Sequence, residues 1–352
     1  MRIITSQMVF FIYGVMLSIV GSSLQAIGLC IWKLHSISSN INLDTSRIEL
    51  RETHATPLLP IPLPKHTPTK KSFSLDNKIP WIWVSGLCSF AIGNICDFVA
   101  LGIAPLSVVT LLGSWSLVVS IFLANMFANE VVSKYDIASI VFIVCGIVLT
   151  VIGSDHRPNE WPLPRLIHHY EEPKVIVLLA ILASIVAAGL IAIHLDFVAR
   201  KKRVCLDDQS VIERPSKTIR ALYVIVGSVV GNFTALFGKA FAGLLLFTFS
   251  GQDQFNSPFV VVIILVFAVS LPLQIYLINA SLAVNDILYH IPNFYVFWNV
   301  GNILTGAIFY EETAHFSSSN WALYVVGVLL LFGGVTCTNT AAARKLQCTN
   351  SS

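Results

Sequence analysis

Charged residues are scarce in this chain. Lys, Arg, Asp and Glu make up 12% of its 352 residues, whereas hydrophobic residues make up 55%. Soluble domains ordinarily carry about a quarter charged residues, so the composition argues against a soluble globular enzyme. The formal net charge of +3 is too small to indicate a nucleic-acid partner, and none is expected.

Motifs of enzyme and metal chemistry are also missing. The sequence has no GxSxG, HExxH or P-loop pattern, the arrangements that serve hydrolysis and phosphoryl transfer. Its seven cysteines form no CxxC pair, so neither a zinc site nor a disulfide framework is indicated. We therefore expect no enzymatic activity and no cofactor.

Long apolar runs stand in place of these features. A run of about 20 apolar residues is enough to cross a hydrocarbon core about 30 Å thick. The first run lacks a small-x-small cleavage pattern and is interpreted as a retained anchor. We predict an all-α polytopic membrane protein with nine transmembrane helices, at residues 8–32, 80–103, 105–128, 135–154, 174–198, 220–249, 258–283, 287–310 and 320–341.

The placement of Lys and Arg predicts the orientation of these spans. If the amino terminus is non-cytosolic, 17 of the 22 basic residues fall on the cytosolic side, as the positive-inside rule requires. The carboxyl terminus is then cytosolic. We expect the plasma membrane or an endosomal or secretory endomembrane as the location.

The regions between spans differ in composition. The stretch 35–79 is rich in proline and polar residues and is predicted to be a disordered cytosolic loop. Its Pro57 to Pro60 spacing also matches an adaptor ligand, although a plain linker explains it as well. The expected division is helix 1 (1–34), Pro-rich loop (35–79), helices 2 to 4 (80–154), non-cytosolic loop (155–173), helix 5 (174–198), basic cytosolic loop (199–219), helices 6 to 9 (220–341) and cytosolic tail (342–352).

An internal repeat links the two halves of the chain. The segments 97–130 and 279–312 align without gaps at an offset of 182 residues. The paired helices are five spans apart, and because five is odd the two halves are inverted. We predict a 4+1+4 arrangement of inverted repeats, which is frequent in secondary transporters with a substrate site near the midplane.

Polar groups inside the spans are the candidate functional residues. A charge at the membrane centre costs at least about 2.5 kcal/mol and calls for a partner or a function. Asp97 is the predicted metal ligand, supported by Asn94, Asn279 and Thr110, because Mg²⁺ prefers oxygen ligands. Lys239 is the predicted counter-charge of Asp97. Adhesion between helices is the alternative role of the amides.

A second group of polar residues follows the expected pathway. Glu130 and Glu312 come after spans on opposite faces, where they either gather cations in vestibules or brace the next turn, with Ser133 as a helix N-cap. The segment 168–172 reads His-His-Tyr-Glu-Glu and is interpreted as an amphipathic surface segment, not as a metal site. The further pathway candidates are Asp286, Tyr295, Asn299 and Asn302.

Several of these residues lie in motifs of a known family. The run 93–100 (GNICDFVA), the pair Ala104-Pro105, the stretch 127–130 (FANE) and the triplet 238–240 (GKA) resemble NIPA-type magnesium transporters of the drug/metabolite transporter superfamily. The resemblance implies nine spans and transport of Mg²⁺. The family's carboxylate before its Asn is absent here, and Asp97 stands about one helical turn further along.

The predicted function is transport of divalent cations, Mg²⁺ first, by alternating access between inverted repeats. An organic-solute carrier of the same superfamily, for metabolites or nucleotide-sugar-like compounds, is one alternative, with Lys239 binding an anionic group. A non-transporting membrane receptor or scaffold is another. The expected partners are the transported cation, the lipid bilayer, a second copy in a homodimer and an adaptor on the Pro-rich loop.

Overall fold

The computed structural model describes residues 8–31, 79–128, 133–155, 161–207, 215–252, 254–285 and 287–350. The predictions for the Pro-rich loop, Glu130 and Asp286 concern residues outside this part. Helices joined by turns make up the described chain. Their bounds are Met8–Ile31, α2 (Ile79–Ile103), α3 (Leu106–Leu112), α4 (Trp115–Ala128), α5 (Lys134–Gly153), α6 (Leu163–Tyr170), α7 (Pro173–Asp207), α8 (Lys217–Phe249), α9 (Pro258–Val284), α10 (Ile287–Ile308) and α11 (Ser318–Asn350).

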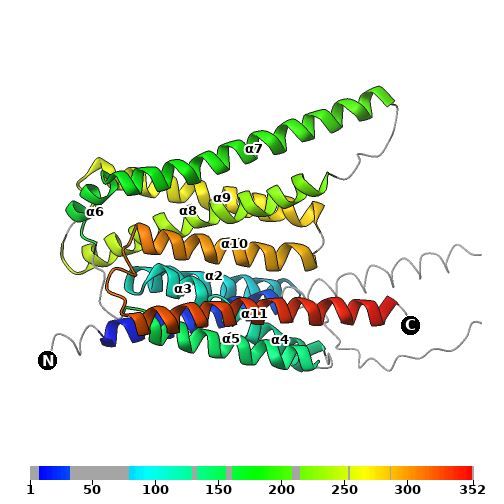
Figure 1. Cartoon of the computed structure of the whole chain (residues 1–352), viewed down its shortest axis with the longest axis horizontal. Coiled ribbons are helices and arrows are strands. Elements are labelled where there is room, and N and C mark those ends of the chain that lie inside the picture. Colours follow the sequence, from blue (N-terminus) through cyan, green and yellow to red (C-terminus); the bar gives the residue numbers. More distant parts are fainter. Residues whose placement is uncertain are drawn as a thin grey trace, which may run out of the picture.

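The long helices run side by side in one bundle (Figure 1). The short helix α6 lies across one end, and α7 diverges from α8 toward the opposite end. Helix Met8–Ile31 begins at the end marked by α6, whereas α11 finishes at the other. The first described residue, at the start of helix Met8–Ile31, and the last, at the end of α11, therefore lie at opposite ends of the bundle.

Eight helices of the described chain are long and apolar enough to cross a membrane, with α3 and α4 counted together over Leu106–Leu123. Helix α10 corresponds to the expected span 287–310 but is not among them. It has 22 residues, which reach about 33 Å at about 1.5 Å per residue, so its length suffices. Its apolar character is reduced by interior polar residues, among them Asn299 and Asn302.

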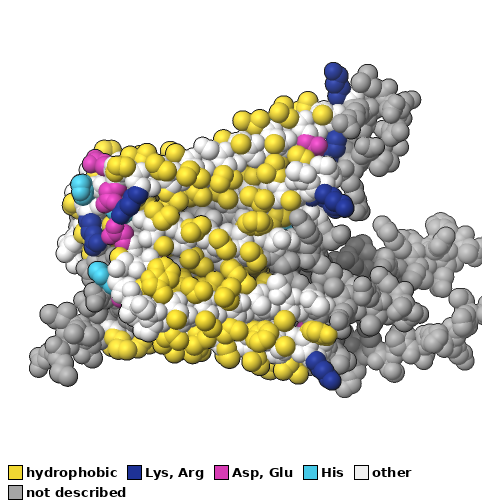
Figure 2. Space-filling view, in the orientation of Figure 1, with side chains coloured by type: hydrophobic (Ala, Val, Ile, Leu, Met, Phe, Trp, Pro, Cys, Tyr) yellow, Lys and Arg dark blue, Asp and Glu magenta, His cyan; other side chains and the backbone are white. Residues whose placement is uncertain are grey.

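The surface of the bundle matches a lipid environment. Apolar side chains cover its sides, and the charged side chains gather at the two ends (Figure 2). Ile95 and Leu195, for example, are each 62% exposed on the flanks of α2 and α7. An apolar surface of this extent is unusual for a soluble monomer and agrees with an integral membrane protein.

The expected span 105–128 is divided into α3 and α4 by a tight turn at Gly113 and Ser114. The N–H of Ser114 donates to the Leu111 carbonyl at 3.0 Å, and the Ser116 hydroxyl donates to the Gly113 carbonyl at 2.7 Å. Such i to i+3 bonds wind the chain more tightly than an α-helix. The span therefore consists of two α-helical segments joined by one tight turn.

Helices α5 and α11 cross at a pair of glycines. A Cβ on Gly146 would lie 2.8 Å from the Gly327 carbonyl oxygen, and a Cβ on Gly327 would lie 2.8 Å from the Gly146 carbonyl oxygen. Because neither position has room for a side chain, the two backbones touch directly. The N-terminus of α5 is capped by Ser133, as predicted, in a capping box with Asp136.

Two more glycines, one near each end of the α5–α11 contact, also lie against the backbone of the other helix. A Cβ on Gly153 would meet the Asn320 carbonyl oxygen at 3.0 Å, and one on Gly334 would meet the Ser139 carbonyl oxygen at 3.1 Å. Each glycine of α5 thus has a counterpart in α11 with the matching contact. The contact between α5 and α11 is therefore close along most of the length of α5.

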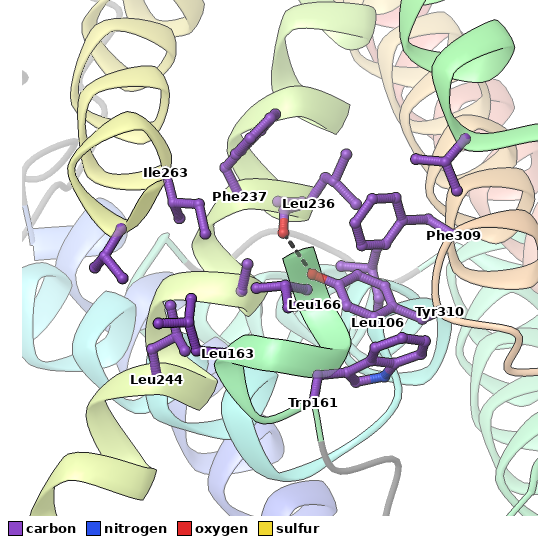
Figure 3. Packing of buried hydrophobic residues seen from close by; sticks show 14 residues of the cluster. Leu106, Trp161, Leu163, Leu166, Leu236, Phe237, Leu244, Ile263, Phe309 and Tyr310 are labelled. Atoms are coloured by element: carbon purple, nitrogen blue, oxygen red, sulfur yellow. Dashed lines mark hydrogen bonds between the residues drawn. The ribbon is translucent and has the colours of Figure 1, made fainter. Parts of the chain in front are cut away.

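Beneath α6 lies an aromatic and aliphatic core (Figure 3). Leu163 and Leu166 bury one face of α6 against α8 and α9, next to Trp161. The Tyr310 hydroxyl donates to the Leu236 carbonyl at 2.7 Å, so the turn after α10 is fastened to the middle of α8. Within the segment 168–172, which was expected to lie on the surface, His168 and Glu171 are exposed, whereas His169 is buried.

Candidate functional site

Asp97 lies near the middle of the bundle on the face of α2 that meets helix Met8–Ile31. Its two carboxylate oxygens accept hydrogen bonds from the Ser18 hydroxyl at 3.0 Å and the Gln25 side-chain amide at 2.7 Å. Gly21 lies between these donors, and a Cβ there would come within 2.8 Å of the carboxylate. The absence of a side chain at Gly21 therefore makes room for the Asp97 carboxylate.

Lys239 does not neutralise Asp97, which corrects the expected pairing. The Lys239 ammonium lies 3.4 Å from the Glu312 carboxylate and donates to the Ala104 carbonyl at 2.6 Å. It also lies 4.9 Å above the ring of Tyr310, a favourable cation–π position. The sequence could not show this pairing, because Glu312 comes to Lys239 from the turn after α10.

Glu312 is buried inside the bundle and does not stand in an open vestibule. Its carboxylate accepts hydrogen bonds from the backbone N–H groups of Leu106 and Ser107 and from the Ser107 hydroxyl. Pro105 interrupts the hydrogen-bond ladder between α2 and α3. Glu312 and Lys239 satisfy the N–H groups and the carbonyl that this break leaves without helical partners.

A cluster of buried polar side chains lies between α8, α10 and the turn after α3. Asn232, Asn299 and Asn302 are each at most 1% exposed. Oδ1 of Asn232 and of Asn299, both side-chain polar atoms of Asn302, the Ser114 hydroxyl and the Trp298 indole N–H have no hydrogen-bond partner among the described residues. Buried polar atoms normally have a partner, so this polar interior is suited to water or an ion.

The close contact of α8 with α10 positions these amides. A Cβ on Gly301 would lie 1.7 Å from the Asn232 side-chain nitrogen, so only glycine allows Asn232 to lie there. Trp298, one turn before Asn302, contacts Gly231 of α8 and approaches Gly113 between α3 and α4. The polar interior therefore reaches from α8 across α10 to the α3–α4 turn.

The supporting ligands predicted around Asp97 lie elsewhere. Asn94 is exposed and donates to the Phe90 carbonyl of its own helix, and Asn279 is exposed on α9. Residues three apart differ by about 60° around a helix, which is enough to carry Asn94 from the interior to the surface. Thr110 is buried, and its hydroxyl donates to the Leu106 and Ser107 carbonyls of α3.

The pathway candidates on α10 do lie in the interior. The hydroxyls of Tyr295 and Ser116 are 3.4 Å apart, linking α10 to α4. Asn299 and Asn302 follow on the buried part of α10. These three residues form the polar stripe that lowers the hydropathy of this helix.

Sequence reasoning assigned no role at the site to Ser18, Gln25, Asn232 or Trp298. The first two share one helical stripe with Gly21, and Asn232 lies one residue after Gly231 in a second small-residue stripe. Small residues next to a polar residue within a span were therefore the sequence signal for a buried polar side chain. It does not tell which neighbouring helix the polar group meets.

One surface crevice of about 330 Å³ lies between α7, α8 and α9 and is lined mostly by apolar side chains, including Val186, Phe233 and Leu265. None of the polar residues of the interior cluster lines it. An apolar crevice on the flank of a membrane bundle suits an acyl chain better than an ion. Two polar groups therefore remain as candidates, the Asp97 carboxylate beside the first helix and the polar interior between α8 and α10.

Comparison with known proteins identifies the family. The family model described as "Magnesium transporter NIPA" matches residues 75–343. "Probable magnesium transporter NIPA8" of Arabidopsis thaliana is 26% identical over 256 residues, which cover 72% of this chain and 57% of that protein. "Probable magnesium transporter NIPA2" of the same plant is 26% identical over 255 residues, 72% of this chain and 70% of that protein.

"Magnesium transporter NIPA3" of Homo sapiens is 24% identical over 266 residues, which cover 71% of this chain and 58% of that protein. The matches thus span little more than half the length of two of these three relatives. No solved structure matches the chain. Because the family model covers most of the chain, including Asp97, Lys239 and Glu312, the chain belongs to the NIPA magnesium transporter family.

Proposed function

We propose that this protein transports a divalent cation, Mg²⁺ first, by alternating access between two inverted halves. The observation that carries the proposal is that the Asp97 carboxylate has no positively charged partner among the described residues. Among the described residues, no Lys, Arg or His lies within ion-pair distance of its carboxylate, which is held by two neutral donors. A half-buried carboxylate without a counter-charge, at the centre of a membrane bundle, is a ligand for a mobile cation.

The ligand chemistry supports a cation that keeps part of its water shell. Mg²⁺ is commonly held by one or two carboxylates while it retains several waters. Asp97 supplies the carboxylate, and the unpaired amide oxygens of Asn232, Asn299 and Asn302 supply acceptors for bound water or for the ion. The relatives named as magnesium transporters favour the same ion.

An organic-anion carrier has less support. Lys239, the residue that would hold an anionic group, already pairs with Glu312 and donates to the Ala104 carbonyl. A substrate anion would have to break both contacts. We therefore keep Lys239 and Glu312 as positioning residues of the α2–α3 break.

The reciprocal packing of α5 and α11 supports the inverted repeat. A shift of 181 residues relates Gly146 to Gly327 and Gly153 to Gly334, and it also relates Ser139 to Asn320. This shift is one residue smaller than the 182 of the sequence alignment. Halves related by a two-fold axis in the membrane plane are the usual basis for alternating access.

Packing also suggests a different counterpart for Asp97. Gly21 meets Asp97, and in the second half Gly231 meets Gln274, where a Cβ would lie 2.9 Å from the Gln274 side-chain nitrogen. We therefore propose Gln274, in place of Asn279, as the packing counterpart of Asp97, although the shift of 181 residues pairs Asp97 with Ile278. The site would then have a charged half and a neutral half.

We further propose nine spans with a non-cytosolic amino terminus. Helix α10 has the length of a span, and its polar residues face the interior. Lys134, Lys201 and Lys217 lie at the end of the bundle opposite α6, which would be the cytosolic end by the positive-inside rule.

The test is ion flux in proteoliposomes. Purified protein is reconstituted and uptake of Mg²⁺, Mn²⁺ and organic anions is measured for wild type and Asp97→Asn. We expect Mg²⁺ uptake by the wild type and a loss of at least about tenfold in the variant, which corresponds to about 1.4 kcal/mol of ion binding. Asp196→Asn is the matched control.

Asp196 is also a carboxylate of a long apolar helix, but it pairs with Arg200 on α7 at 2.7 Å. Its variant should transport Mg²⁺ at a rate close to that of the wild type. Flux of organic anions alone, or equal Mg²⁺ flux with and without the Asp97 carboxylate, would reject the proposal.

A further inference from the structure

We propose that His169, Glu172 and Glu311 form a binding site for a transition-metal ion, with Zn²⁺ as the probe, at the end of the bundle where α6 lies. One ligand atom of each residue lies within 4.8 Å of the other two. His169 is in the last turn of α6, Glu172 precedes α7, and Glu311 comes from the turn between α10 and α11. This site is separate from Asp97 and does not depend on what the protein transports.

His169 is oriented as metal-binding histidines usually are. Its side chain is buried, and Nε2 faces the Phe309 carbonyl as a hydrogen-bond donor. The ring is held between Trp161, at 4.7 Å between centroids, and Phe309, at 5.3 Å. An N–H donated to a backbone carbonyl orients the ring, and the other nitrogen can bind a metal ion once its proton is released.

The other ring nitrogen, Nδ1, points at the first carboxylate. Nδ1 of His169 lies 2.8 Å from Oε1 of Glu172. The pKa of the Glu172 carboxyl lies below its usual value, because Lys174 and then His169 donate hydrogen bonds to it. Metal binding here would displace the Nδ1 proton that His169 donates to Glu172, because a metal ligand must be deprotonated.

The donor set selects the class of metal. One imidazole nitrogen with two carboxylate oxygens suits Zn²⁺ and its transition-metal neighbours, whereas Mg²⁺ prefers oxygen ligands. Zn²⁺ bonds are about 2.0 to 2.2 Å long, so ligand atoms that now lie within 4.8 Å of one another must rearrange around the ion. The two glutamate side chains are 32% and 39% exposed and can make this movement.

The ammonium group of Lys174 bridges the two carboxylates. The Lys174 ammonium lies 3.0 Å from Glu172 and 2.5 Å from Glu311. Its side chain is 46% exposed, so it can turn into solvent when an ion arrives. The position between His169 and the two carboxylates thus already attracts a positive charge, and a metal ion would compete with Lys174 for it.

The experiment is calorimetric Zn²⁺ titration of the full-length protein in detergent. We expect one Zn²⁺ per chain whose affinity falls by about 10- to 100-fold in Glu172→Gln and in Glu311→Gln, the usual effect of weakening a metal site. Lys174→Ala should bind about two- to fivefold more tightly, because exposed ion pairs are weak. Glu171→Gln, an exposed neighbour outside the cluster, should match the wild type.

These outcomes separate a built site from binding elsewhere. Equal affinity in wild type, Glu172→Gln and Glu311→Gln would overturn the proposal, as would the absence of Zn²⁺ binding by the wild type. His169→Ala is not used alone, because its buried ring contributes to packing. Because binding is measured without flux, failure of this proposal leaves magnesium transport untouched, and the reverse also holds.

Discussion

At the scale of single residues, Glu312 joins parts of the chain that are far apart in sequence. Its carboxylate caps α3, about 200 positions earlier, and faces the Lys239 ammonium of α8. The side chains of Lys239 and Glu312 are 7% and 3% exposed. Removing one partner of such a buried pair leaves the other charge uncompensated.

We predict that Glu312→Gln destabilises the protein. Breaking a buried ion pair costs up to about 3–5 kcal/mol, and here the cap of α3 is weakened as well. The measurement is the apparent melting temperature of the purified protein in detergent, which should fall. Glu311→Gln is the neighbouring control and should change it little, because the Glu311–Lys174 pair is exposed.

A second variant distinguishes the ion pair from the cap. Lys239→Met in the Glu312→Gln background removes the unpaired charge and should recover part of the lost stability. Equal melting temperatures for Glu312→Gln and Glu311→Gln would show that the buried pair does not contribute.

At the scale of elements, α10 is the polar helix of the bundle. Its neighbour α8 approaches it so closely at Gly301 that Asn232 occupies the space of a side chain. Hydropathy alone ranks α10 below the other spans, yet its polar residues are the ones that face the interior. The composition of a helix and its place in the bundle are linked here, because a polar stripe can only be covered by other helices.

We predict opposite effects for two glycine substitutions in this region. Gly301→Ala should destabilise the protein by about 1–3 kcal/mol, the usual range for overpacking, because its Cβ would lie 1.7 Å from Asn232. Gly243→Ala in α8 should stabilise it by about 0.5–1 kcal/mol, because nothing lies within 4 Å of its Cβ position. Thermal unfolding in detergent measures both, and a neutral Gly301→Ala would contradict the tight α8–α10 contact.

At the scale of the whole molecule, the two ends of the bundle have different chemistry. The α6 end carries the His169–Glu172–Lys174–Glu311 network, which joins the turn before α7 to the turn after α10. The opposite end is marked by basic residues (Figure 2). This asymmetry leads to a prediction about sidedness.

We predict that the α6 end is non-cytosolic. In a variant whose native cysteines are replaced, Glu171→Cys should react with an impermeant maleimide from the non-cytosolic side of sealed vesicles. Lys217→Cys should react only from the cytosolic side. Both positions are exposed, at opposite ends of the bundle, and labelling of both from one side would contradict the nine-span orientation.

Much of the helical framework was predictable from the sequence. Apolar runs and their lengths depend on local composition, so the expected positions of the spans agree with helices from Met8 to Asn350. The division into α3 and α4 was not predicted, because it depends on hydrogen bonds at Gly113 and Ser116 that hydropathy does not register. The capping role of Ser133 was predictable, because its bonds are local.

The sequence by itself determined that Asp97 is a carboxylate within a membrane span and that α10 is the polar helix, because both follow from residue types along one segment. Only the tertiary structure decided that Lys239 pairs with Glu312, that Asn94 and Asn279 lie on the surface, and that Glu311 joins His169 and Glu172. The physical reason is that helical periodicity fixes which residues share a stripe, whereas the neighbour that the stripe meets depends on how distant helices pack.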